Sequence, residues 1–116
     1  MTLQEIDIPD AFNRVSRNSE AELLIDEAND AIERFMLADQ EVIENFVTCD
    51  FHLTQSALTW IHDNHLLAGN RFCELGSGFG VVALLAAQMG MEAIGIEIEQ
   101  VLVNQAIDLE HSVRFC

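Results

Sequence analysis

The spacing of apolar residues changes in character near residue 70 of this 116-residue chain. Up to that point apolar side chains recur three and four positions apart, which is the period of an amphipathic helix. After it, short apolar runs are separated by glycines, as is typical of strands that alternate with helices. The pattern predicts a helical N-terminal extension over 1–70 and a strand–helix–strand–helix unit over 71–116.

The first expected helix begins at Ser19. Ser19 and Glu22 have the spacing of a capping box, in which each side chain bonds the backbone N–H of the other residue. Apolar residues then follow at intervals of three and four, so that one face of the helix is apolar. These residues are Leu24, Ile25, Ala28, Ala31, Ile32, Phe35 and Met36.

Two further helices are expected before residue 70. A short one covers Val42 to Phe46, and the sequence VTCDF then predicts a break. A longer helix runs from about Thr54 to Asn64. Its expected buried residues are Ala57, Trp60 and Ile61.

The second part of the chain predicts two strands that are buried on both faces. RFCEL at residues 71–75 and AIGIEI at residues 93–98 are apolar runs without clean alternation, a pattern typical of strands covered on both sides. Val81–Met89 predicts a helix that Gly90 closes as a C-cap, and Glu99–Val113 predicts another. A right-handed crossover would make the two strands parallel neighbours.

The stretch ELGSGFG, residues 74–80, joins the first of these strands to a helix. Glycine suits such a sharp turn because it adopts conformations that a side chain would strain. We assign Gly76 to the tight turn, Gly78 to the close approach of a ligand, and Gly80 to close packing of the helix start against the strand. The N–H groups of the first helical turn then face the ligand.

Two acids flank this loop and indicate the kind of ligand. Glu97 ends the second strand beside the loop, where a carboxylate can accept hydrogen bonds from both hydroxyls of a ribose. Glu74 lies two residues before the first glycine, where it would repel a diphosphate and attract an ammonium or sulfonium group. The spacing also departs from the dinucleotide fingerprint, because position 81 is Val. A cationic nucleoside is therefore favoured over NAD or FAD.

Together, ELGSGFG and GIEIE resemble the class I S-adenosylmethionine-dependent methyltransferases over about residues 71–110. The resemblance implies an α/β, Rossmann-like methyltransferase fold with a parallel sheet, of which this chain holds the first two strands after a helical N-terminal extension. It also implies S-adenosylmethionine as the cofactor. By the same resemblance, Glu74 faces the methionine end, Gly76, Ser77, Gly78 and Gly80 wrap the methionine and ribose, Glu97 holds the ribose hydroxyls, and Ile98 packs on the adenine.

The chain is short for this family. Two parallel strands and their helices leave apolar faces uncovered. We therefore expect a piece of a longer methyltransferase, inactive by itself and able to self-associate through those faces. The alternative is a non-catalytic acidic interaction module that keeps a nucleoside-binding Rossmann-like fold. Neither the methyl acceptor nor a catalytic residue can be identified.

The charge balance limits the partners. Asp and Glu number 20 against 5 Arg and no Lys, for a net charge of −15. Such a surface repels nucleic-acid phosphates and anionic membranes, and no apolar run reaches the length of a membrane span. The acids serve either as a solubilising shell or as a dock for a basic partner. Three cysteines without CxxC spacing indicate reduced thiols and a cytoplasmic location.

Several other residues receive ordinary roles. His62 and His65 lie three apart without a third ligand nearby, so no metal site is expected. Cys73 is expected to be a small buried side chain. Glu99 is expected to cap the last helix, where an acid interacts well with the helix dipole. Thr48 and Asp50 have two interpretations, as ordinary loop residues or as part of a lid over the methionine end.

Overall fold

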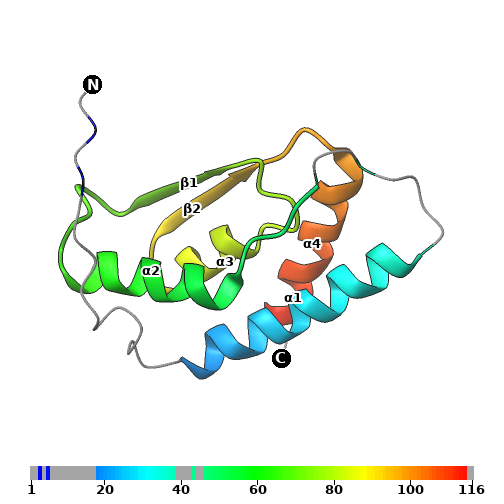
Figure 1. Cartoon of the computed structure of the whole chain (residues 1–116), viewed down its shortest axis with the longest axis horizontal. Coiled ribbons are helices and arrows are strands. Elements are labelled where there is room, and N and C mark those ends of the chain that lie inside the picture. Colours follow the sequence, from blue (N-terminus) through cyan, green and yellow to red (C-terminus); the bar gives the residue numbers. More distant parts are fainter. Residues whose placement is uncertain (1–2, 4, 6–17, 39–42, 44–45, 115–116) are drawn as a thin grey trace.

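The computed structural model describes residues 3, 5, 18–38, 43 and 46–114. In these residues four helices accompany a sheet of two parallel strands (Figure 1). The predicted mixed α/β class and the order of elements after residue 70 are confirmed. The elements are α1 (Ser19–Leu37), α2 (Phe51–Asp63), β1 (Arg71–Leu75), α3 (Val81–Gln88), β2 (Glu92–Ile96) and α4 (Gln100–Arg114).

The two strands pair in parallel, with Arg71 opposite Glu92 and Leu75 opposite Ile96. Helix α3 connects them and packs against both. The described helices lie to one side of the sheet (Figure 1). Parallel, adjacent strands joined by a helix were predicted from the sequence, and this arrangement is confirmed. It brings the C-terminal ends of both strands to the same edge as the glycine loop.

The sheet face opposite α3 is uncovered in the described part of the chain. Leu75 is 79% exposed, Ile94 59% and Ile96 52%. Cys73, which alternates with Leu75 along β1 and so shares its face, is also exposed. The predictions that both strands are buried on both faces and that Cys73 is buried are therefore wrong. An unalternating apolar run indicates a strand with two covers, and here only one cover is present.

The core lies between the four helices. Leu24 and Ile25 of α1 and Leu85 of α3 are the largest fully buried side chains. Helix α1 packs against both α3 and α4, so its apolar face is covered along most of its length as predicted. Met36 is the exception among its predicted core residues, because it is 63% exposed near the end of the helix.

The cap of the first helix differs from the predicted one, and the second helix has a cap that was not predicted. Asn18, not Ser19, caps α1: its backbone is extended and its Oδ1 accepts the N–H of Glu20 at 2.8 Å. Asp50 caps α2 in the same way, since its Oδ1 accepts the N–H of Leu53 at 3.0 Å. Both acceptors satisfy N–H groups that a first helical turn leaves without a partner.

The Asp50 cap makes α2 begin three residues earlier than predicted, at Phe51 rather than Thr54. The earlier start changes which residues face the core, because Phe51, Gln55 and Leu58 are buried. The predicted buried set of Ala57, Trp60 and Ile61 is only partly buried. The short helix predicted over 42–46 lies largely outside the described residues.

The region after β1 follows the prediction more closely. Helix α3 ends at Gln88 and is followed by Gly90 with a positive φ of 89°, the left-handed conformation that closes many helices. Strand β2 ends at Ile96, so Glu97 lies just beyond the strand. No helix among the described residues is long and apolar enough to cross a membrane.

Candidate functional site

The glycine loop turns sharply between β1 and α3. Gly76, Gly78 and Gly80 have φ values of 68°, 54° and 73°, in the left-handed region where a side chain is strained. The N–H groups of Gly76 and Ser77 both donate to the carbonyl of Ile96, at 2.8 and 3.0 Å. The loop is therefore tied to the C-terminal end of β2. The prediction that these glycines permit a sharp turn is confirmed.

The neighbours of two loop glycines differ from the expected ones. A Cβ at Gly80 would lie 3.4 Å from the Cβ of Ala106 in α4, so Gly80 brings the start of α3 close to α4 rather than to a strand. A Cβ at Gly78 would lie 3.4 Å from the Phe46 ring. The space beside Gly78 is thus bordered by the segment that joins α1 to α2.

Gly95, inside β2, is a site residue that the sequence reasoning missed. A Cβ there would lie 2.8 Å from both Cβ and Oγ of Ser77. Its missing side chain lets the glycine loop lie directly over β2. A glycine inside an otherwise apolar strand often marks such a close backbone approach, and this was the available signal.

We expect Gly95→Ala to lower the free energy of unfolding by about 1–3 kcal/mol, the usual effect of overpacking. The added methyl meets the Cβ of Ser77 at 2.8 Å, and this atom cannot move without the loop backbone. Urea denaturation measures the change. Gly69→Ala is the matched control, because nothing lies within 4 Å of an added Cβ there. Equal stability of the two variants would contradict a tight contact between the loop and β2.

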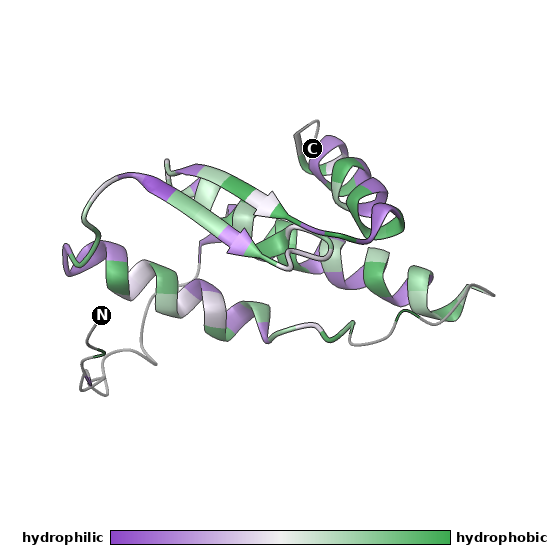
Figure 2. Cartoon of the chain, turned by 90° about the horizontal axis from the view of Figure 1, so that it is seen from above, coloured by the Kyte–Doolittle hydropathy of each residue, from purple (hydrophilic) through white to green (hydrophobic). Residues whose placement is uncertain are grey.

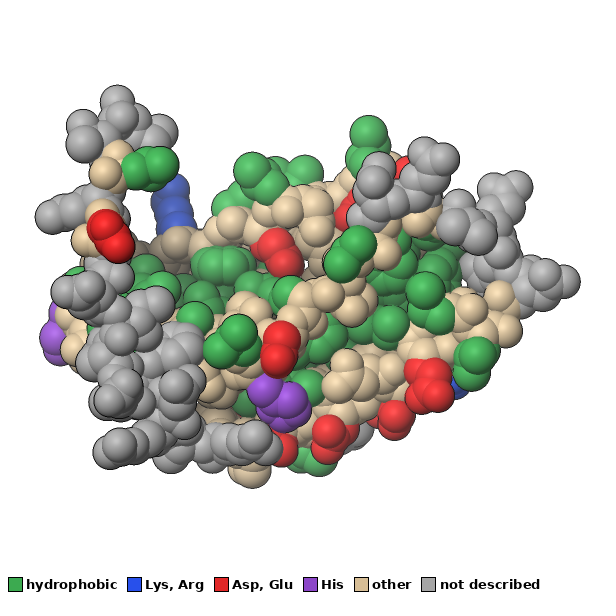
Figure 3. Space-filling model, in the orientation of Figure 1, with side chains coloured by type: hydrophobic (Ala, Val, Ile, Leu, Met, Phe, Trp, Pro, Cys, Tyr) green, Lys and Arg blue, Asp and Glu red, His purple; other side chains and the backbone are tan. Residues whose placement is uncertain are grey.

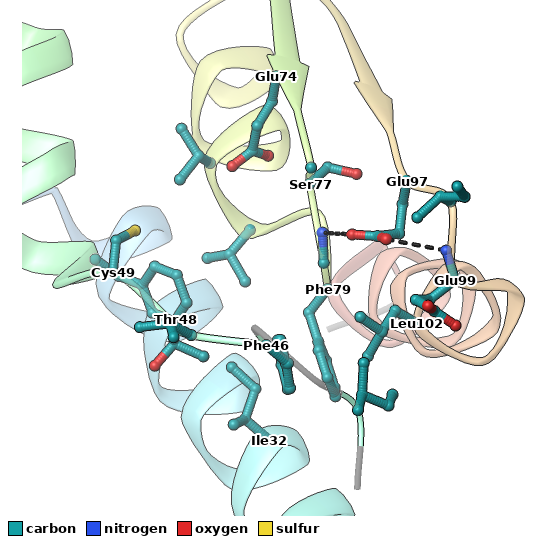
Figure 4. Close-up of a pocket in the computed structure, with 18 residues that line it drawn as sticks. Ile32, Phe46, Thr48, Cys49, Glu74, Ser77, Phe79, Glu97, Glu99 and Leu102 are labelled. Carbon is teal, nitrogen blue, oxygen red and sulfur yellow. Dashed lines mark hydrogen bonds between the residues drawn. The ribbon is translucent and has the colours of Figure 1, made fainter.

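Glu97 joins the glycine loop to the start of α4. Its Oε1 accepts the N–H of Gly78 at 2.8 Å and its Oε2 accepts the N–H of Glu99 at 3.0 Å (Figure 4). The hydrogen bond from the Glu99 backbone is the main cause of a lowered pKa for the Glu97 carboxyl, and that from Gly78 adds to it. Glu97 is therefore an oriented, ionised acceptor at neutral pH.

Glu74 is a half-buried acid on β1. Its Oε1 accepts the N–H of Ala83, in the first turn of α3, at 3.3 Å. Burial raises the pKa of the Glu74 carboxyl above its ordinary value, and the Ala83 hydrogen bond offsets part of that effect. In Figure 4 this carboxylate points toward the side of the pocket where Cys49 lies. A half-buried carboxylate with one weak donor would be stabilised by a cation.

A cavity of about 490 Å³ opens between the glycine loop and the segment that joins α1 to α2. Its volume falls within the range typical of small-molecule sites. Gly80 is the one predicted cofactor residue that does not line it. The predicted residues that do line it are Glu74, Gly76, Ser77, Gly78, Glu97 and Ile98.

Three aromatic rings hold the α1–α2 segment against the glycine loop. Phe79 of the loop stacks on Phe46, with ring centroids 5.8 Å apart and an interplanar angle of 11°. Phe35 of α1 meets Phe79 edge-on at 5.5 Å. The sequence reasoning did not identify this cluster, because the three residues are distant in sequence and follow no local pattern. The cluster fixes one wall of the pocket.

Thr48 and Asp50, which were expected to share one role, lie in different places. Thr48 lines the pocket together with Cys49, whereas Asp50 caps α2. Within the described residues, no group of three or more potential ligands could hold a metal ion.

The charged residues that line the pocket are all acidic. They are Glu74, Glu97 and Glu99, and the described lining contains no Arg, Lys or His. Glu99 directly precedes α4, at the capping position expected for it, and its carbonyl accepts the N–H groups of Leu102 and Val103 at 3.0 and 3.1 Å. Such a lining favours a ligand that carries positive charge and hydrogen-bond donors.

Comparison of the chain with models of protein families, with curated proteins and with solved structures gave no match.

Proposed function

We propose that the pocket binds S-adenosylmethionine and that the chain is the cofactor-binding part of a class I S-adenosylmethionine-dependent methyltransferase. The observation that carries this proposal is the orientation of Glu97. Both carboxylate oxygens accept backbone N–H groups, one from the glycine loop and one from the start of α4. A carboxylate offers about four lone-pair sites, so each oxygen keeps one for a ribose hydroxyl.

The rest of the pocket suits the remaining parts of this ligand. Ile98 lines the pocket and is 94% exposed, so it offers an apolar surface to the adenine. Glu74 supplies negative charge near the cationic methionine end. In methyl transfer the acceptor's lone pair forms the new bond to the methyl carbon while the carbon–sulfur bond breaks, leaving a neutral thioether. The residues of this pocket would contribute by positioning the cofactor.

The second candidate function is a non-catalytic acidic module. The observation that favours it is the distribution of charge, because acids gather along the exposed side of α1 at the lower rim of Figure 3. Asp26, Asp30 and Glu33 are exposed there. This chain alone is expected to be inactive, so the deciding measurement is made on the full-length protein. Its release of S-adenosylhomocysteine in the presence of an acceptor would favour the transferase, since a binding module cannot produce it.

The proposed ligand is tested by isothermal titration calorimetry with S-adenosylmethionine and NAD. We expect S-adenosylmethionine to bind and NAD to give no measurable heat of binding. The physical reason is repulsion of the NAD diphosphate by Glu74, which lines the pocket beside the glycine loop. The loop also departs from the dinucleotide fingerprint, because its third glycine is at position 80 and position 81 is Val. Binding of NAD as tight as that of S-adenosylmethionine would refute the proposal.

A further inference from the structure

Phe46 lies against the glycine loop at the residue that donates a hydrogen bond to Glu97. A Cβ at Gly78 would lie 3.4 Å from Cε1 of Phe46, so the ring occupies the space into which a side chain at this position would point. The N–H of Gly78 donates to Oε1 of Glu97 at 2.8 Å. A single loop residue therefore contacts both the segment that joins α1 to α2 and the acid proposed to hold the ribose. Figure 2 shows the glycine loop and this segment from above the sheet.

The next residue of the loop is held by the same ring. Phe79 is 2% exposed and stacks on Phe46 (Figure 4), with the ring planes 11° apart. Phe35 of α1 meets both rings edge-on, with its centroid 6.1 Å from that of Phe46 and 5.5 Å from that of Phe79. Phe46 is therefore fixed by two other rings, and in this position it restricts the movement of residues 78 and 79.

Gly78 depends on such a restraint more than its neighbours do. Glycine has more backbone freedom than any other residue, so conformational preference alone does not hold the Gly78 N–H toward Glu97. The other backbone hydrogen bonds of the loop start from N–H groups on either side of it, those of Gly76, Ser77 and Gly80. The Phe46 ring therefore limits the movement by which Gly78 would leave the carboxylate.

We propose that Phe46 is a positioning residue for Glu97, which holds the Gly78 N–H on the carboxylate and so couples the helical N-terminal extension to binding of the ribose. The inference rests on the proposed function for the identity of the ligand, and on the contacts of Phe46, Gly78 and Glu97 for the coupling. Release of the extension from the loop lowers the affinity for the cofactor. Because coupling between two equilibria is reciprocal, bound cofactor opposes that release.

The coupling is measured by NMR on the whole chain without ligand. In Phe46→Ala we expect the Gly78 amide proton to exchange at least about tenfold faster than in the wild type, because local opening no longer has to displace the ring. The Glu97 carboxyl should titrate at a higher pKa. The Glu99 N–H contributes most to the lowered pKa of the Glu97 carboxyl and the Gly78 N–H adds to it, and the variant weakens the second of these bonds. Glu74 and Glu99 are the other charged residues of the described pocket lining, and both remain in the variant.

Three further variants separate positioning from packing. Leu58→Ala removes a core side chain of α2 that is 9% exposed, so it should lower the stability while the Gly78 exchange rate and the Glu97 pKa stay unchanged. Phe46→Tyr keeps the ring and should keep the wild-type value of both quantities. Phe46→Leu keeps an apolar side chain but not the stack on Phe79. It should change both quantities in the same direction as Phe46→Ala, and it replaces that variant if the alanine protein does not fold.

Titration calorimetry with S-adenosylmethionine connects the coupling to the cofactor. We expect Phe46→Ala to bind about three- to tenfold more weakly, because a carboxylate released by one donor must be immobilised when the ribose binds. Wild-type exchange at Gly78 in this variant, an unchanged Glu97 pKa, or equal changes in Leu58→Ala would overturn the inference. Unchanged affinity in a variant whose Glu97 pKa has risen would overturn it as well. If the wild type does not bind S-adenosylmethionine, the proposed function fails, and the two ligand-free measurements still decide whether Phe46 positions Glu97.

Discussion

Glu97→Ala is expected to weaken S-adenosylmethionine binding at least about tenfold. Each hydrogen bond from a ribose hydroxyl to this carboxylate is charge-assisted and contributes about 1.5–3 kcal/mol, and about 1.4 kcal/mol corresponds to a factor of ten. The lowered pKa of the Glu97 carboxyl keeps it ionised at neutral pH, so the full effect is expected there. Titration calorimetry of the wild-type and variant proteins measures it.

Glu99→Ala is the matched control, because Glu99 also lines the pocket but contributes its backbone N–H to Glu97, which alanine retains. We expect the affinity of Glu99→Ala for S-adenosylmethionine to change far less than that of Glu97→Ala. The alanine at 97 also removes the acceptor for two backbone N–H groups, at about 1 kcal/mol each, so urea denaturation is needed to confirm that both variants are folded. A larger effect at 99 than at 97 would mean that the ribose acid is assigned two positions too early.

The part of the site that follows from local sequence was predictable. Alternating glycines after an apolar run fix the sharp turn, and the left-handed conformations of Gly76, Gly78 and Gly80 express that requirement directly. The distance from the loop to Glu97 follows from the lengths of a helix and a strand that connect neighbouring parallel positions. These constraints act within a few residues of each other, so one sequence is enough to reveal them.

The remaining features depended on which elements cover one another, and the local sequence pattern does not carry this information. The apolar runs of β1 and β2 predicted cover on both faces, yet Ile94 is 59% exposed, because the second cover is missing from the described part of the chain. The stack of Phe46 on Phe79 joins residues far apart in sequence. The caps were missed for a different reason: Asn18 and Ser19 are both good capping residues, and only the backbone geometry selects Asn18.

Glu74→Gln is expected to separate stability from binding. Burial raises the pKa of the Glu74 carboxyl, so the ionised form is less favourable in the folded chain than in the unfolded one. The variant should therefore have a higher free energy of unfolding than the wild type at neutral pH. In the wild-type chain the Ala83 nitrogen lies 3.3 Å from Oε1 of Glu74. Glutamine keeps a side-chain oxygen that can accept the same N–H, so the start of α3 is retained.

The same substitution is expected to weaken S-adenosylmethionine about tenfold or more, since the sulfonium end loses a nearby carboxylate in a partly buried site. Glu92→Gln is the control, because Glu92 is exposed and outside the cofactor pocket, and its exposed pair with Arg71 contributes little. Lower stability with unchanged affinity for Glu74→Gln would show instead that Glu74 serves only to hold α3.

The dependence on pH gives an independent measurement of the same carboxyl. A group whose pKa is higher in the folded than in the unfolded state binds more protons when folded, so stability contributed by Glu74 rises as pH falls through that raised pKa. Affinity for the cation changes in the opposite direction, because protonation removes the charge that attracts it. As pH falls, the contribution of Glu74 should therefore make the wild-type protein more stable. Over the same pH range the wild-type protein should bind S-adenosylmethionine less tightly. Both trends should be absent from Glu74→Gln, and calorimetry with urea denaturation at each pH compares the two proteins.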